Sequence, residues 1–507
     1  MACSAGESLH GQVPAIQPMQ QPAVAPQLAQ PSQWPPPASP LTQADVERIV
    51  QQELSRREAQ QHLTAQPEAA PATNTDEKVV GSELDLKLRW NHGLEAKSAS
   101  GDFRVHVGGR THFDGVWLTA DDTGLAGAGG VGDADAAVFR RGRLAVSGTL
   151  YEVFEWAVEY DFFNTVNDNV GLQPASDELG NVINVPAPTD IWWEFKHLPV
   201  VGALRIGNMK EPIGLEHQTS SRFLDFMERS FNQDAFTGPF NNGFTPGIML
   251  HKLTEDKRAT MSLGVFKNAT NAFAFDSGDG EYAVDGRVSC LPWYDEPSEG
   301  RYLLHLGISG SHRDPDDGRV RIRSRASLRN GPGATNPVLA DTGFFFADSQ
   351  DLLGGEAALV YGPWLLQAEY IASLSSGASV GGVDQGTVYS NGYYAEVLYF
   401  LTGEHRPYDH DRGAFTRIIP HSNAFLVRTA EGAGFGPGAW QVAARYSQLD
   451  LNDSGIQGGV IEDVTLGLNW FLNPNMKLQF NYVYTRRDAL AGVGDIYGFG
   501  TRLAMDF

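Results

Sequence analysis

The sequence has almost no cysteine. Its 507 residues include two, Cys3 and Cys290, which are separated by more than half of the chain. Neither a CxxC metal-binding pair nor a framework of disulfides can be built from two such distant residues. The sequence therefore offers no cysteine-based metal site and no covalent scaffold.

Long apolar runs and an excess of positive charge are also missing. No stretch of about 18 apolar residues occurs, so no transmembrane helix is predicted. Lys and Arg number 38 against 61 Asp and Glu, a formal net charge of −23. Nucleic-acid binders need a basic surface for phosphate contacts, so this balance argues against such a partner.

The N-terminus, MACSAGESLHGQVPAIQP, lacks the basic and apolar regions of a signal peptide. As written, this counts against export. A misplaced start or a signal that has been removed would explain the absence equally well.

Familiar enzyme signatures are absent as well. The sequence contains no GxSxG nucleophile elbow, no HExxH and no GxxxxGK[ST]. The stretch HRPYDHDR brings together His405, Asp409, His410 and Asp411, which could hold a metal. An acidic, solvated loop is the interpretation we favour there. We expect no enzyme activity, no cofactor and no resident metal.

The N-terminal part of the chain differs in composition from the rest. Residues 1–40 are rich in Gln, Pro and Ala and predict a disordered linker. Residues 41–63 place apolar side chains at helical spacing, which predicts a short amphipathic helix. Two to three heptads do not decide between a lone surface helix and a coiled coil. Residues 64–83 return to linker composition.

From residue 84 to 507 the pattern is that of β-strands. Segments of roughly 9–13 residues alternate apolar and polar side chains between Gly, Asn, Asp and Pro. Val158 and Tyr160 share one parity, and Glu159 and Asp161 the other. A bilayer-spanning strand needs only about 9–11 residues, and short turns opposite long loops are typical of outer-membrane barrels. Roughly 16 to 18 strands predict an all-β, antiparallel transmembrane barrel with an aqueous lumen.

The last strand supports a barrel over a soluble sandwich or propeller. In YGFGTRLAMDF, Tyr497, Phe499 and the terminal Phe507 lie on one parity, with Gly498 and Arg502 on the other. A final aromatic residue on the apolar face resembles the recognition signal of outer-membrane barrels, and a soluble edge strand has no need of it.

Several stretches resemble one family, the phosphate-selective porins O and P. They are FRVHVGGRTHFDGVW, FRRGRLAVSGTLYEVFEWAVEYDF, TDIWWEFKHLPVVGALRIGNMKEPIGLEHQTSSRFLDFMERS and YGFGTRLAMDF, within about residues 100–507. The resemblance implies a trimer of 16-stranded outer-membrane barrels that conduct anions through a narrow pore lined by Arg and Lys. It also implies that residues 210–243 fold inward as a constricting loop. A connection of this length between two strands is unusual unless it has a function.

The stretch RVRIRSRASLR supplies the most conspicuous candidate for an anion pathway. Arg319, Arg321, Arg323 and Arg325 recur with a period of two, so in one strand they would share a face and form a positive ladder. A guanidinium suits phosphate because its planar fork matches two oxygens and stays charged. The adjacent DPDDG leaves a solvated hairpin open as the alternative.

Arginines of the stretch VFRRGRL are further candidates. Arg141 and Arg143 have the lumen parity, whereas Arg140 has the lipid parity. Arg140 must therefore reach a membrane rim, unless a bulge at Gly142 shifts the register.

The inward loop adds Lys210 to the predicted pathway. Each of these cations also has a structural interpretation. Glu211 would neutralise Lys210, and Glu159 and Asp161 would pair with the arginines of VFRRGRL.

The sequence thus predicts an outer-membrane porin for the passive diffusion of small anions, with phosphate as a candidate solute and without a chemical step. Outer-membrane lipid and two further copies of the chain are the expected partners, with the N-terminal segment in the periplasm. Three alternatives remain open: a non-conducting structural or adhesive barrel, a nonspecific or cation-preferring pore, and a soluble secreted β-protein.

Overall fold

The computed structural model describes residues 80–121, 133–163, 165–166, 183–184, 186–237, 243–267, 280–329, 336–430, 432–490 and 492–507. The predicted linker 1–40, the predicted helix 41–63 and nearly all of the linker 64–83 lie outside these ranges. The chain divides into Met1–Glu77 and Lys78–Phe507, and the second unit is the one described below. Within the described residues, no helix has the length and apolarity needed to cross a membrane.

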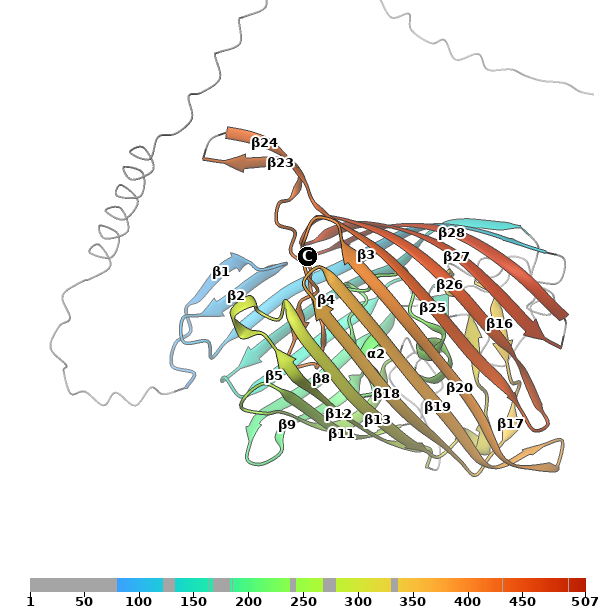
Figure 1. The fold of residues 1–507 in the computed structure, drawn as a ribbon. Helices are drawn as coiled ribbons and strands as arrows, with labels where there is room; N and C mark the ends of the chain where they lie inside the picture. The colour runs from blue at the N-terminus through green and yellow to red at the C-terminus, as the bar shows by residue number, and fades with distance from the viewer. Residues whose placement is uncertain are drawn as a thin grey trace, which may run out of the picture. The chain divides into compact units, whose positions relative to one another are not determined.

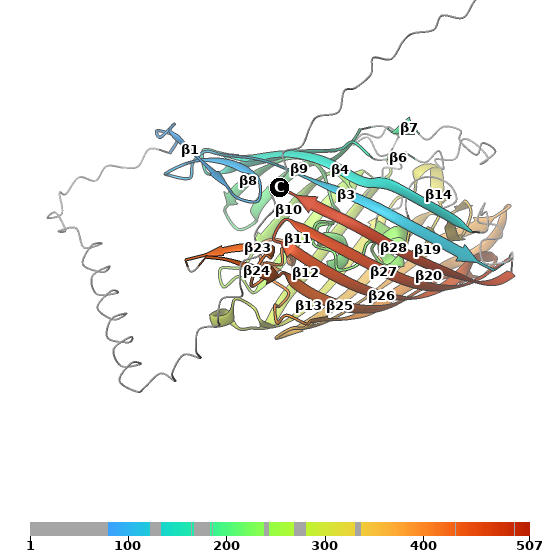
Figure 2. The same cartoon turned by 90° about the horizontal axis from the view of Figure 1, so that it is seen from above.

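Sixteen of the described strands form a closed antiparallel barrel, as Figures 1 and 2 show. They are β3 (Arg104–Ala120), β4 (Ala134–Leu150), β5 (Phe154–Asp161), β8 (Ala187–Leu198), β9 (Gly202–Met209), β10 (Thr245–Leu253), β11 (Ala259–Lys267), β12 (Tyr282–Tyr294), β13 (Tyr302–Arg313), β18 (Ser349–Tyr361), β19 (Trp364–Val380), β20 (Val383–Phe400), β25 (Ala439–Asp453), β26 (Ile456–Asn473), β27 (Met476–Ala489) and β28 (Gly492–Asp506). Each pairs with the next in this order, and β28 returns to β3 with Arg502 opposite Asp114. The predicted barrel of about 16 strands is confirmed.

Shorter elements lie in the connections and at the ends of the barrel. The strands are β1 (Leu86–Trp90), β2 (Leu94–Ser98), β6 (Thr165–Val166), β7 (Ile183–Asn184), β14 (Arg319–Val320), β15 (Arg323–Arg325), β16 (Val338–Asp341), β17 (Phe345–Phe346), β21 (Tyr408–Asp409), β22 (Ala414–Phe415), β23 (Ala424–Thr429) and β24 (Gly432–Pro437). The helical turns are α2 (Leu215–Gln218), η1 (Gln233–Thr237), η2 (Glu296–Ser298) and η3 (Asp316–Gly318).

Side-chain alternation along the strands separates an apolar outer face from a polar inner face. Val158 and Tyr160 are exposed on the outside of the wall, whereas Glu159 and Asp161 at the alternate positions are buried on the inside. The same period of two governs the last strand, where Phe499 is exposed and Arg502 is buried. The predicted parities of both strands are therefore correct.

The connection between β9 and β10 lies inside the barrel, where Figure 1 shows α2 behind the strands. We call its described residues 210–237 the inward loop. Barrel side chains hold its backbone: Asn481 accepts a hydrogen bond from the Met227 N–H at 2.8 Å, and Lys477 donates to the Leu224 carbonyl at 2.6 Å. Because these partners are on β27, the loop reaches across the lumen from β9.

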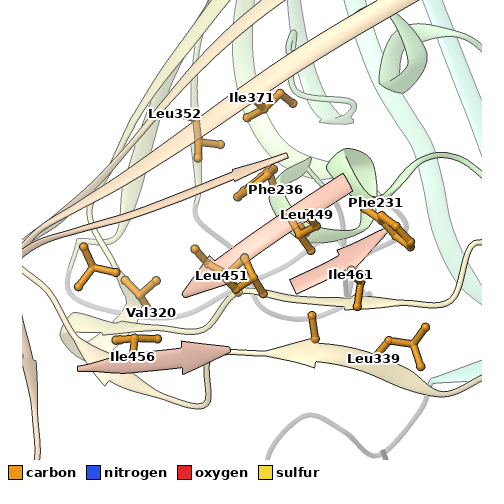
Figure 3. Close-up of a cluster of buried hydrophobic side chains, with 14 of the residues drawn as sticks. Phe231, Phe236, Val320, Leu339, Leu352, Ile371, Leu449, Leu451, Ile456 and Ile461 are labelled. Carbon is orange, nitrogen blue, oxygen red and sulfur yellow. The ribbon is translucent and has the colours of Figure 1, made fainter. Parts of the chain in front are cut away.

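The arginine-rich stretch is not the single strand that its period suggested. Arg319 and Val320 form β14, Arg323–Arg325 form β15, and the chain bends between them. Val320 and Ile322 instead pack with Phe236 of the inward loop and with Ile456 of the wall in an apolar cluster, shown in Figure 3. Burial of these apolar side chains overrides the local strand pattern.

The connection between β20 and β25 also turns inward. Strand directions alternate, so this connection leaves the same end of the barrel as the two-residue turn 474–475 and the C-terminus. We call this end the C-terminal end. Arg406 and Phe415 in the connection are buried. Within the stretch 405–412, for which a solvated loop was predicted, Arg406 is buried, His405, Asp409 and His410 are half-buried and Asp411 is exposed. A long connection therefore leaves the end that also carries the short turn 474–475.

Candidate functional site

A cavity of about 450 Å³ lies between the inward loop and the wall formed by β3, β4, β5, β8 and β9. Its described lining includes thirteen Arg or Lys side chains against four Asp or Glu: Arg104, Arg110, Arg140, Arg141, Arg143, Arg205, Lys210, Arg222, Arg229, Arg325, Arg329, Arg412 and Arg417, with Glu155, Glu159, Asp190 and Glu228. The chain as a whole carries −23, so basic residues are strongly concentrated here. A cavity with this balance favours anions.

Glu228 of the inward loop is ringed by arginines. One of its carboxylate oxygens lies 2.9 Å from Arg502 Nη2, 3.0 Å from Arg140 Nε and 3.5 Å from Arg141 Nη1, and the other lies 3.8 Å from Arg329 Nη2. Burial by itself would raise the pKa of Glu228, but Arg140 and Arg141 outweigh it and hold that pKa well below its usual range. Arg502 also pairs with Asp114 at 2.6 Å and Arg329 with Asp234 at 3.3 Å, whereas Arg140 and Arg141 have Glu228 as their shared carboxylate among the described residues.

A bulge in β4 brings Arg140 into this cluster. Arg141 pairs with His112 across the sheet and Phe139 pairs with Phe113, so Arg140 between them has no opposite residue. The extra residue reverses the parity on one side of it. The predicted register shift therefore occurs, at Arg140 rather than at the glycine two residues later, and Arg140 faces the lumen.

Arg143 is fully engaged by carboxylates. Its Nε lies 2.8 Å from Asp161 Oδ2 and its Nη1 lies 3.1 Å from Glu159 Oε1. Arg110 approaches the same Glu159 at 2.5 Å. The predicted pairing of Arg143 with Glu159 and Asp161 is therefore present, as expected for a structural residue. The Arg143 side chain nevertheless lines the cavity.

Lys210 follows β9 at the start of the inward loop. Its neighbour Glu211 pairs with Arg313 at 2.6 Å, so the expected neutralisation of Lys210 by Glu211 does not occur. Lys210 Nζ donates instead to the carbonyls of His217 and Thr219, the latter at 3.2 Å. Burial, followed by the positive charge of Arg229, holds the pKa of Lys210 well below its usual range.

Arg229 resembles Lys210 in its surroundings. It donates to the Glu216 carbonyl at 2.9 Å and to the Thr219 carbonyl at 2.6 Å. Among the described residues, neither Arg229 nor Lys210 has a carboxylate within ion-pair distance. The Thr219 carbonyl thus holds the buried Arg229 and the half-buried Lys210, on which carboxylates act only from beyond ion-pair distance.

Hydroxyl groups lie next to these two cations. Arg110 donates to the side-chain oxygens of Ser221 at 2.8 Å and of Ser220 at 3.3 Å. Both serines line the cavity. Serine hydroxyls can turn to donate to an anion, so they add hydrogen-bond donors to the charged groups.

The structure places four of the seven predicted residues in the cavity lining. Arg141, Arg143, Lys210 and Arg325 line it, and Arg319, Arg321 and Arg323 do not. Arg321 pairs with Asp341 in its own connection, with Nε 2.9 Å from Oδ1. Arg325 reaches Asp234 of the inward loop at 2.5 Å. The bend between β14 and β15 separates Arg319 from Arg325, and an irregularity in the pairing of β15 with β16 between Ser324 and Arg325 separates Arg323 from Arg325.

Sequence reasoning missed several lining cations, among them Arg110, Arg222, Arg229 and Arg329. A signal for Arg110 was present, because Arg110, His112 and Asp114 alternate with apolar or small residues in RTHFDG. Arg222 and Arg229 lie in a loop with no strand period, so no local pattern indicates their direction.

Comparisons with known proteins identify a matching family model and several similar proteins. The family model described as phosphate-selective porin O and P matches residues 111–491. Porin O of Pseudomonas aeruginosa is 26% identical over 461 residues, which is 85% of this chain and 94% of Porin O. A protein of Caulobacter vibrioides is 30% identical over 291 residues, covering 55% of this chain and 52% of that protein. Among solved structures, the anion-selective porin from Comamonas acidovorans is 11% identical, covers 80% of this chain and 100% of its own, and has a TM-score of 0.45.

Proposed function

Because the chain belongs to the phosphate-selective porin O and P family, we propose that this outer-membrane porin passes small anions, with inorganic phosphate as its preferred solute. The family and the barrel are those of a channel rather than of an enzyme. The observation that carries the proposal is a pair of cations, the half-buried Lys210 and the buried Arg229, which have no carboxylate within ion-pair distance among the described residues.

A buried charge without a counter-ion is costly, so these two cations gain stability when an anion arrives. Phosphate would also accept hydrogen bonds from Arg110 and from the hydroxyls of Ser220 and Ser221. The remaining arginines along the wall supply further positive charge on either side of this point. An anion can then move between neighbouring favourable positions without being trapped at one of them.

The test is single-channel recording from purified protein in planar bilayers. A KCl gradient gives the ion preference from the zero-current potential, and added phosphate reveals block of the chloride current. In the variant Lys210→Gln/Arg229→Gln we expect the zero-current potential to shift toward cation preference and the block by phosphate to weaken at least tenfold.

The matched control is Arg319→Gln, which removes a positive charge from a half-exposed side chain outside the cavity lining. We expect it to behave as the unmodified protein. Equal anion preference and equal phosphate block in the double variant and the unmodified protein would exclude the pair as the selective site.

We further propose that the porin is a homotrimer, on the strength of its family membership. Sedimentation of the detergent-solubilised barrel gives its mass directly. A monomeric mass in several mild detergents would count against the trimer, without bearing on the anion pathway.

A non-conducting barrel that anchors surface loops is the second candidate. The apolar cluster in Figure 3 favours it, because side chains such as Phe231, Leu451 and Ile461 fill part of the lumen. The two functions give different recordings. Folded, membrane-inserted protein that shows no discrete current steps would support the anchor.

A further inference from the structure

The hairpin of β23 and β24 exposes large apolar side chains at the C-terminal end of the barrel, where Figure 1 shows it extending beyond the wall. Phe435 is 76% exposed, Leu426 63% and Phe425 52%. Leu426 and Phe435 are directly opposite each other across the two strands. Such side chains at the surface of a barrel end require a covering environment.

Apolar side chains lie on both faces of the hairpin. Leu426 and Phe435 share one face, and Val427 points to the other because neighbouring residues of a strand alternate. Phe425, whose φ of 65° interrupts the alternation, meets the Phe435 ring edge to face with centroids 6.1 Å apart. A two-stranded hairpin in water is marginally stable at best, since it has no second layer to bury its side chains. A protein partner docking on one face would leave the other in water. An environment that surrounds the hairpin covers both.

The base of the hairpin is tied to the outer aromatic surface of the wall. The indole N–H groups of Trp440 and Trp470 donate to the Pro437 carbonyl, at 3.1 and 2.7 Å. These two rings stack with centroids 4.9 Å apart, and Phe425 meets Trp470 edge to face at 5.4 Å. Trp470 lies an even number of residues from the exposed Leu466 on β26, so both side chains are on the outward face of the barrel.

This continuity identifies the environment. Tryptophans at the end of a membrane barrel mark the level of the lipid headgroups. The hairpin extends that aromatic surface without a break through Phe425. We infer that β23 and β24 form a lipid anchor, in which Phe425, Leu426 and Phe435 enter the boundary between headgroups and acyl chains of the adjacent leaflet.

Backbone chemistry sets the depth of this anchor. Each strand of a two-stranded hairpin has one edge whose N–H and C=O groups pair with nothing in the other strand. Such groups are too costly in the hydrocarbon core, where no water can satisfy them. At the headgroup boundary, water and lipid esters satisfy them while the side chains leave water. Arg428 on the same hairpin is exposed and can contact lipid phosphates there.

The experiment uses a spin label in the complete barrel. In a Cys3→Ser/Cys290→Ala background, Phe435→Cys is labelled and the protein is inserted into vesicles of phosphatidylethanolamine and phosphatidylglycerol. Collision with molecular oxygen, which concentrates in lipid, is compared with collision with a water-soluble nickel chelate. We expect oxygen to dominate at residue 435. The control Ser454→Cys lies in the turn between β25 and β26 at the opposite end, and we expect the nickel chelate to dominate there.

Two results would overturn the anchor. Dominant collision with the nickel chelate at residue 435 would place the hairpin in water. Protection from both reagents, with dipolar broadening between labels, would show instead that a second copy of the chain covers it. Leu426→Cys, directly opposite Phe435, repeats the measurement if the first label prevents assembly. Neither site lines the basic cavity, so retained current steps verify that each labelled barrel is folded.

Discussion

Arg406 of the connection between β20 and β25 pairs with Asp225 of the inward loop, with Nη2 3.2 Å from Oδ2. Both side chains are buried. Arg406 also donates to the Phe223 carbonyl, so it holds the loop by a side chain and by the backbone. A segment that enters from the C-terminal end of the barrel therefore fixes a loop that begins after β9.

Removing this contact is expected to widen the pathway. In Arg406→Ala, Asp225 loses its cationic partner but keeps the hydrogen bond from Gln441 at 2.9 Å. Breaking a buried ion pair costs about 3–5 kcal/mol. We expect this loss to destabilise the inward loop rather than the wall, because β28 and β3 still close the barrel. We expect larger and noisier single-channel currents. Arg428→Ala, in the exposed hairpin of the same connection, should leave the currents unchanged.

The lowered pKa of Lys210 predicts a pH dependence. Burial and the charge of Arg229 lower this pKa below the ordinary value of 10.5, so the amine loses its proton and charge at a lower pH than a free lysine. Anion preference in a KCl gradient should therefore fall as the pH rises, and it should fall at a lower pH than the one at which an ordinary lysine loses its charge. In Lys210→Arg the charge persists, and we expect a flat profile. A parallel fall in both proteins would assign the titration to another group.

Neutralising Glu228 should strengthen anion preference while weakening the fold. Glu228→Gln removes the negative charge among Arg140, Arg141, Arg329 and Arg502, so the lining becomes more positive. The same change leaves the buried guanidinium group of Arg141 without its carboxylate partner, at a cost of about 3–5 kcal/mol, whereas Arg502 keeps Asp114 and Arg329 keeps Asp234. Zero-current potentials and thermal unfolding measure the two effects.

The control for Glu228→Gln is Glu296→Gln, whose carboxylate pairs with Arg258 at an exposed turn. Exposed pairs contribute about 1 kcal/mol or less, so this variant should match the unmodified protein in both measurements. If Glu228→Gln also matched it, the arginine ring would have no influence on permeating ions.

The bend in the arginine-rich stretch predicts that its members differ in function. Arg325→Gln removes a cavity-lining charge that is paired with Asp234, whereas Arg319→Gln removes a charge near solvent. We expect a decrease in anion preference in the first variant and no change in the second. An equal decrease in anion preference in both variants would instead indicate that Arg319 and Arg325 act together along one anion pathway.

The period of two was enough to predict the wall of the barrel. Residues such as Tyr160 and Phe499 face outward because alternate side chains of a strand point to opposite sides, whatever the rest of the chain does. Arg110 was predictable on the same ground. Arg140 was less so, because a single extra residue reverses the parity and the exact site of a bulge depends on cross-strand packing.

The sequence by itself determined the class of fold, the approximate number of strands and the polarity of the two faces of the wall, since each of these depends on neighbours two residues apart. Only the tertiary structure decided which cations meet in the lumen. Lys210 and Arg229 converge on Thr219 because the inward loop folds back on itself, and Arg319 is separated from Arg325 because Val320 and Ile322 are buried. Contacts between segments far apart in the chain leave no local period from which they could be read.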